Sequence, residues 1–160
     1  MPRIKPEYDT DGVAITCTLA SLATSAARES ASVDNTSNLY LDALVQVKIK
    51  LQAGTPGSDK RVYIYAAGTV DGGTTWPDAV TGADAAITPN SPTQLRLIGV
   101  IEAPTSAGIF ISEPMSVAQA FGGVLPKKWS LVIQNMTNIT FSATGSDHTV
   151  KYQGVWAQSL

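Results

Sequence analysis

The chain has 160 residues, a length that suits one domain with its own core. Charged residues make up 15% of it, against about a quarter in typical globular proteins, and the formal net charge is −2. Lysine and arginine form no cluster larger than the pairs Lys60-Arg61 and Lys127-Lys128, so the basic patch expected for a nucleic-acid or anionic-membrane partner is missing. No apolar run approaches the roughly 18 residues that cross a bilayer.

The N-terminal segment 1–12, MPRIKPEYDTDG, has no hydrophobic periodicity and predicts an arm ahead of a β domain that spans 13–160. The segment also lacks the apolar stretch of a secretory signal, so we expect synthesis and folding in a cytoplasm. We expect a neighbouring subunit to order the arm. The arm residues predicted to contact a partner are Pro2, Arg3, Ile4, Lys5, Pro6 and Tyr8.

Alternation of apolar and polar residues, broken in the longest segment only at Tyr40 and Leu44, predicts strands along the remaining chain, and further strands are expected between the alternating segments. The longest alternation runs from Leu39 to Leu51, and Gly-, Pro- and Asn-rich turns separate the segments. One helical turn is expected at 116–121, before Gly122-Gly123, while 21–38 predicts either an exposed edge strand or a loop. Strands are expected at 13–19, 39–51, 61–69, 94–103, 108–112, 129–133, 139–143 and 150–156.

About eight strands at this spacing are typical of a sandwich or barrel. We therefore predict an all-β fold, a single-domain antiparallel β-sandwich that is jelly-roll-like. An immunoglobulin-like sandwich is the alternative, because both folds produce the same alternating patterns.

The stretch TVDGGTTW, residues 69–76, matches the Asp-box pattern of sialidase-type β-propellers. Asp71 has the position to accept hydrogen bonds from the turn, and Gly72 and Gly73 supply positive φ. Propellers repeat the motif in successive blades, whereas this chain carries one copy and is too short for a propeller. The motif therefore predicts a well-formed turn rather than a sugar-cleaving enzyme.

The remaining polar candidates predict no chemistry. Asp71, Asp78 and Asp84 with Asn90 have the oxygen ligands that calcium prefers, but the spacing of a calcium loop is absent, so solvated loop carboxylates are expected. The single histidine, His148, is expected in an exposed turn. We predict no catalytic, metal or cofactor site, and a protein that is not an enzyme.

Cys17 is the only cysteine, which excludes an intrachain disulfide, and its apolar neighbours predict a buried, unreactive thiol. Among the tryptophans, Trp129 and Trp156 lie on alternating segments and are expected in the core. Trp76 follows the turn and is left as a candidate partner contact, including stacking on a sugar ring.

With these segments in view, the chain resembles virion structural proteins of tailed bacteriophages. The resemblance covers roughly residues 38–160 and rests on the order and character of segments. These are NLYLDALVQVKIKL, VYIYAAGTVDGGTTWPDAVTGADAAI, SPTQLRLIGVI, PMSVAQAFGGVLPKKW, IQNMT and KYQGVWAQSL.

This resemblance implies a jelly-roll-like sandwich that acts as a head decoration or cement protein on the capsid surface, made in the bacterial host. It further implies a homotrimer whose partners are the major capsid protein or other virion proteins, with Ile4 and Tyr8 as arm anchors. The alternative is a tail, neck or appendage component that recognises a host glycan or receptor, with Trp76 as the stacking platform.

Overall fold

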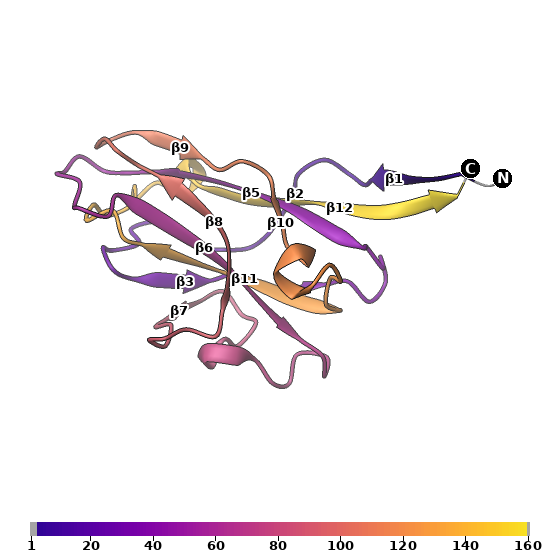
Figure 1. The fold of residues 1–160 in the computed structure, drawn as a ribbon. Helices are drawn as coiled ribbons and strands as arrows, with labels where there is room; N and C mark the ends of the chain where they lie inside the picture. The colour runs from indigo at the N-terminus through magenta and orange to yellow at the C-terminus, as the bar shows by residue number, and fades with distance from the viewer. Residues whose placement is uncertain (1–2, 160) are drawn as a thin grey trace.

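The computed structural model describes residues 3–159, which form two antiparallel sheets packed face to face (Figure 1). Sheet A contains β1 (Ile4–Tyr8), β2 (Val13–Ala14), β5 (Asp42–Lys50), β9 (Ile109–Ile111), β10 (Met115–Ser116) and β12 (Thr149–Ser159). Sheet B contains β3 (Ala27–Glu29), β4 (Val33–Asp34), β6 (Arg61–Thr69), β7 (Ala85–Ile87), β8 (Arg96–Glu102) and β11 (Lys128–Asn135). Three short 3-10 turns complete the described elements: η1 (Pro77–Ala79), η2 (Ala118–Phe121) and η3 (Gly145–Asp147).

The strand order is that of a jelly roll. The short strands β1 and β2 share the partner β12, β3 and β4 share β11, and β9 and β10 share β5, so each pair counts as one interrupted strand. With β7 set aside as an addition at the edge of sheet B, eight strands remain. Counted along the chain, these eight strands are β1/β2, β3/β4, β5, β6, β8, β9/β10, β11 and β12. In this count sheet A has the order first, eighth, third, sixth, and sheet B has the order second, seventh, fourth, fifth. This is the strand order of a jelly roll built from two Greek keys. An immunoglobulin sandwich would place the first and last strands in different sheets, whereas here they pair.

The main core lies between the sheets and follows from the period-two alternation of the long strands. In β5, residues Ala43, Val45, Val47 and Ile49 are fully buried, while the residues between them reach solvent. Trp129 of β11 is also fully buried, which confirms the core position predicted for it. Trp156 is partly buried and packs against the same core.

A second, smaller cluster covers part of the outer face of sheet B. The segment between β6 and β8 folds back over this face, so that Val80 and Leu95 pack on Val132. Trp76, Tyr65 and Ile87 are partly buried around this cluster. Sheet B therefore packs on sheet A within the sandwich and is covered in part by the segment 70–95 on its outer face, where Leu97 and Val100 of β8 stay exposed.

Beyond the sandwich, β1 and the end of β12 form a two-stranded ribbon that projects from the body of the molecule (Figure 1). The pairing runs from Tyr8 opposite Val155 to Ile4 opposite Ser159. Strand β5, the other neighbour of β12, pairs with it only up to Val155. Residues 4–8 of the predicted N-terminal arm therefore form a strand of this ribbon, held by β12 of the same chain.

Several predicted elements differ from the structure. The predicted strand 139–143 is replaced by a single bridge between Phe141 and Leu51, and the strand predicted at 13–19 is ordered as β2 only over its first two residues. The polar segment 21–38 contributes β3, which is no edge strand because it lies between β7 and β11. The helical turn predicted at 116–121 is confirmed as η2, which ends at Gly122 with a φ of 76°.

Candidate functional site

The ribbon formed by β1 and the end of β12 is the candidate site. The direction of its backbone hydrogen bonds shows which residues face the free edge of β1. Asp9 N–H donates to the Gly154 carbonyl at 3.0 Å, and Leu41 N–H donates to the Val155 carbonyl at 2.7 Å. Because backbone groups alternate between the two edges of a strand, Gly154 bonds toward β1 and Val155 bonds toward β5. By the same alternation, Ile4, Pro6 and Tyr8 direct their backbone groups to the free edge of β1.

Pro6 therefore stands where its missing N–H is not needed by β12. Proline within sheets is confined to such edge positions, and it makes an edge a poor template for another strand. The ribbon is thus protected against strand addition along β1. A partner would bind it through side chains.

One side of the ribbon is apolar. Residues directly opposite each other share a face, so Ile4, Pro6 and Tyr8 lie on the same side as Val155 and Ala157. Ile4 is 77% exposed and Tyr8 is 56% exposed. The opposite side carries Lys5 and Glu7, whose side chains form an ion pair of 3.6 Å, and Trp156.

The apolar side continues the outer face of sheet A, because Val155 and Ala157 alternate in step with Lys151 and Gln153 along β12. A two-stranded ribbon is marginally stable in water without further packing. The exposed apolar side therefore marks the ribbon as an interaction surface.

Tyr40 anchors the base of the ribbon. Its ring lies over Gly154, where a Cβ atom would overlap the ring, and its centroid is 5.5 Å from that of Trp156. Its hydroxyl donates to the Asp9 carboxylate. This hydrogen bond lowers the pKa of Asp9, while burial, together with Asp9, raises the pKa of Tyr40 to about 12. The aromatic ring thus joins the ribbon to the core of the sandwich.

The TVDGGTTW turn forms the hydrogen bonds that its sequence predicts. The Asp71 carboxylate accepts from the Thr69 hydroxyl at 2.6 Å and from the N–H groups of Thr74 and Thr75 at 3.0 and 3.1 Å. The hydrogen bond from the Thr69 hydroxyl is the main cause that lowers the pKa of Asp71 well below its usual range, and the hydrogen bonds from Thr75 add to this effect. Gly72 and Gly73 have φ values of 77° and 97°. The motif acts here as a turn that closes the end of β6.

Trp76 belongs to the same turn and not to the ribbon. Its indole N–H donates to the Gly73 carbonyl at 3.0 Å, and the backbone of Gly82 lies against its ring. The side chain is half-buried beside the second cluster. Trp76 therefore stabilises the fold of the segment 70–95 over sheet B.

The prediction of solvated carboxylates is wrong for Asp78. This side chain is 6% exposed and accepts hydrogen bonds from Asn90 at 3.0 Å, Gln94 N–H at 3.1 Å and the Thr93 hydroxyl. It is buried because the segment 70–95 folds over sheet B, which local sequence does not reveal. Burial raises the pKa of Asp78, but these hydrogen bonds outweigh it and leave the pKa lowered.

Asp84 is occupied elsewhere, since it forms an ion pair of 2.6 Å with Arg28 and accepts from Thr18 N–H at 3.0 Å. The aspartates proposed as alternative calcium ligands therefore serve three separate networks. No group of three acidic, histidine or cysteine residues with the geometry of a metal site occurs among residues 3–159.

The prediction of an exposed His148 is also wrong, since this residue is 8% exposed. Its ring stacks on Phe141 with centroids 5.6 Å apart, its Nδ1 faces Lys50 N–H at 3.4 Å, and its Nε2 lies 3.0 Å from the Ser142 carbonyl. The imidazole thus satisfies two backbone groups where the segment 139–143 fails to form a strand. Cys17 is half-buried, and burial raises the pKa of its thiol to about 12.

The structure thus brings together Ile4, Pro6 and Tyr8 on one side of the ribbon, with Lys5 on the other side and exposed Arg3 before the strand. Pro2 lies outside the described residues. Sequence reasoning missed the β12 half of this surface, Val155 and Ala157, although the run Val155-Trp156-Ala157 is apolar at every position and so marks both faces of the predicted strand.

No known family model matches the chain, and neither curated proteins nor solved structures are significantly similar to it. Between residues 3 and 159, no helix is long and apolar enough to cross a membrane. The fold and the site define the class as a jelly-roll β-sandwich with a projecting terminal ribbon.

Proposed function

We propose that the chain is a non-enzymatic virion structural protein of a tailed bacteriophage, a head decoration or cement protein bound to the capsid surface. The observation that carries the proposal is the apolar side of the projecting ribbon, with Ile4 and Tyr8 exposed. The resemblance of residues 38–160 to virion structural proteins supports the same role.

In this role the ribbon binds the major capsid protein or a neighbouring virion protein and links adjacent subunits of the lattice. A protein that binds only the assembled lattice stabilises that state by mass action. Aromatic side chains that become buried at the centre of an interface supply a large share of the binding energy, and the apolar contacts around them exclude water. Tyr8 and Ile4 are therefore the anchors of the contact. The resemblance to head decoration proteins further implies that the chain assembles as a homotrimer.

The test uses heads of the encoding phage, prepared without this protein, to which the purified chain is added back. We expect the double variant Ile4→Ser with Tyr8→Ser to lose at least about tenfold in affinity for the heads, the effect of removing apolar anchors. Occupancy is measured by co-sedimentation and by cryo-electron microscopy of the loaded heads.

The matched control is Val70→Ser with Leu97→Ser, which removes two exposed apolar side chains away from the ribbon. This control should bind like the wild type. Equal binding of the ribbon variant and the control would contradict the proposal, as would the absence of the wild-type chain from purified virions by mass spectrometry.

A further inference from the structure

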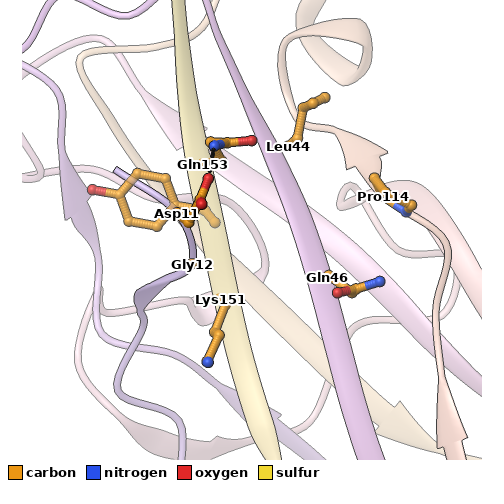
Figure 2. A pocket seen from close by; sticks show the side chains of 8 residues that line it. Asp11, Gly12, Leu44, Gln46, Pro114, Lys151 and Gln153 are labelled. Atoms are coloured by element: carbon orange, nitrogen blue, oxygen red, sulfur yellow. Dashed lines mark hydrogen bonds between the residues drawn. The ribbon is translucent and has the colours of Figure 1, made fainter. Parts of the chain in front are cut away.

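The free edges of the two sheets differ in how they are protected against pairing with another chain. Sheet A ends on one side in β1, where Pro6 faces the free edge. On its other side it ends in the short strands β9 and β10, and Pro114 lies between them (Figure 2). Sheet B ends on one side in β7, which has three residues and is followed by Pro89. Prolines and very short strands are devices that keep an edge from pairing.

Strand β8, at the other side of sheet B, has neither form of protection. It is seven residues long, RLIGVIE, and contains no proline. Ala103 N–H donates to the Lys60 carbonyl at 2.8 Å, so the alternation of backbone groups turns those of Val100 and Glu102 to the free edge. Within residues 3–159, no strand pairs with β8 on that side. The edge therefore offers its backbone hydrogen bonds to a strand of another chain.

Apolar side chains lie beside this edge on the outer face of sheet B. Leu97 is 52% exposed and Val100 is 36% exposed. They stand directly opposite Tyr65 and Tyr63 of β6, whose rings stack with centroids 6.2 Å apart. Apolar and aromatic pairs across neighbouring strands stabilise a sheet. A strand added to β8 would therefore extend an apolar surface that the segment 70–95 leaves uncovered.

The two charged residues of β8 stand at its two ends and have opposite signs. The strand begins with Arg96, which forms no ion pair within residues 3–159, and ends with Glu102. When two copies of β8 lie antiparallel, the Arg96 end of each copy meets the Glu102 end of the other. A parallel arrangement would bring like charges together, which destabilises a strand pair. The charges of β8 therefore match a second, antiparallel copy of the same strand.

The surroundings of Glu102 do not oppose this arrangement. Its carboxylate lies 3.7 Å from Arg61, which is directly opposite on β6, and its side chain remains 76% exposed. Asp59 and Lys60 are the other charged side chains beside it, so the charges at this end cancel. In the antiparallel pair Glu102 lies between Arg61 of its own chain and Arg96 of the second copy. The result is a ladder of alternating charge across three neighbouring strands.

We propose that β8 pairs antiparallel with β8 of a second copy of the chain, so that two copies of sheet B join into one continuous sheet across a two-fold axis. Such a contact uses the same surface on both copies, which requires self-complementary backbone groups, apolar side chains and charges. The inference goes beyond the proposed function, because the contact needs no capsid. A two-fold contact cannot close a trimer, so in the proposed role it joins chains of neighbouring trimers.

The experiment measures the mass of the purified chain by sedimentation over a wide concentration series. One seven-residue edge makes a small contact beside the roughly 1,200–2,000 Å² of stable interfaces, so we expect pairing only at high concentration. The mass of the wild type should then double. Arg96→Glu and Glu102→Arg each place like charges at both ends of the pair, and each should weaken the doubling at least about tenfold.

An equimolar mixture of the two variants is the decisive sample. The negative ends of one variant then face the positive ends of the other, so the doubling should return, which misfolded variants could not produce. Lys127→Glu makes the same charge change as Arg96→Glu at an exposed site outside β8 and should behave like the wild type. A wild-type mass that stays constant, or a mixture that behaves like its two components, would overturn the proposal.

Amide hydrogen exchange, followed by NMR, locates the contact on the wild type. The N–H groups of Val100 and Glu102 should exchange more slowly at the concentration where the mass doubles, whereas Ile101 N–H, which faces β6, should be protected throughout. A doubled mass without this added protection would place the contact elsewhere and reject the pairing of β8. The mass at the lowest concentration tests the homotrimer separately, so either idea can fail without the other.

Discussion

Asp71 and Asp78 sit seven residues apart in one segment, and each carboxylate holds a different part of it. Asp71 binds the backbone of an exposed turn, whereas Asp78 is buried under the segment that covers sheet B. Asp147 plays a third role, since it accepts from the Ser142 hydroxyl at 2.5 Å and pairs with Lys50. Hydrogen-bonded carboxylates thus fix the loops of a chain with few charges.

These carboxylates make stability depend on pH in the acid range. Hydrogen bonds from Thr69 to Asp71 and from Ser142 to Asp147 lower their pKa values below the ordinary 3.8, and Asp78 is also lowered despite its burial. A lowered folded-state pKa contributes stability above the ordinary value, and this contribution is lost as the pH falls below 3.8. We expect the urea midpoint to drop between pH 5 and pH 3. The variant Asp78→Asn should show a smaller drop of the urea midpoint over this pH range. An equal drop in the variant and the wild type would show that Asp78 does not contribute to the acid sensitivity.

Gly154 controls the attachment of the ribbon. A methyl group at this position would overlap the Tyr40 ring, so Gly154→Ala should displace the ring and destabilise the fold by about 1–3 kcal/mol. Thermal unfolding measures this loss, and the fluorescence of Trp156, which contacts Tyr40, should change in the native state. Gly145→Ala, where a Cβ meets no atom within 4 Å, is the control and should leave both signals as in the wild type.

At the scale of elements, the free edge of β1 is the place where the ribbon could pair with a strand of another copy of the chain. Pro6 faces the free edge of β1, and such a residue is one of the devices that prevent pairing between exposed edges. Glu7 is its neighbour but directs its backbone groups to β12. The two positions therefore give a matched pair for testing the edge.

We expect Pro6→Thr to restore an N–H group on the free edge and to promote self-association through β1. Light scattering over a concentration series should show larger species for this variant. Glu7→Thr adds the same side chain at a position whose N–H is already bonded to β12, and it should behave like the wild type. Identical scattering by the two variants would show that the proline does not protect the edge.

The sequence patterns predicted the long strands well because each has one wet and one dry face. The segment 61–69 matches β6 over its full length. Several short strands were missed because tertiary contacts form them. The segment 21–38 was predicted as an exposed edge strand or a loop, yet its strand β3 lies inside sheet B between β7 and β11, and its buried Glu29 accepts a hydrogen bond from Thr81 N–H at 2.8 Å. The strand predicted at 39–51 begins only at Asp42, because Leu39 lies at a positive φ of 54°.

For the candidate site, sequence alone identified the exposed residues of the arm but not their arrangement. The first dozen residues have no periodicity of their own, since their pattern becomes meaningful only opposite β12. The sequence identified Pro6 as a possible contact residue. Its position at the free edge of β1 can be recognised only from the pairing register with β12. The burial of His148 was missed for the same reason, because its partners come from β5 and from the loop before η3.

At the scale of the whole molecule, the proposed cement role predicts an oligomer. Size-exclusion chromatography with light scattering should give a mass three times that of the 16.8 kDa chain. The double variant Ile4→Ser with Tyr8→Ser tests whether the ribbon contributes to this assembly. If the variant is a monomer, the ribbon forms a contact between the subunits of the trimer. A wild-type monomer at high concentration would contradict the homotrimer.

The pairing of Ile4 with Ser159 has a consequence for the covalent order of the chain. Both strands of the ribbon end at the same point in space, far from the sandwich (Figure 1). A short glycine-rich linker can therefore join these ends, while new termini are opened in the exposed turn at Gly72-Gly73. Such a circular permutant should keep both sheets and the core, because the linker closes the ribbon as a hairpin. The jelly roll then depends on which strands are neighbours in space and not on which residue is translated first.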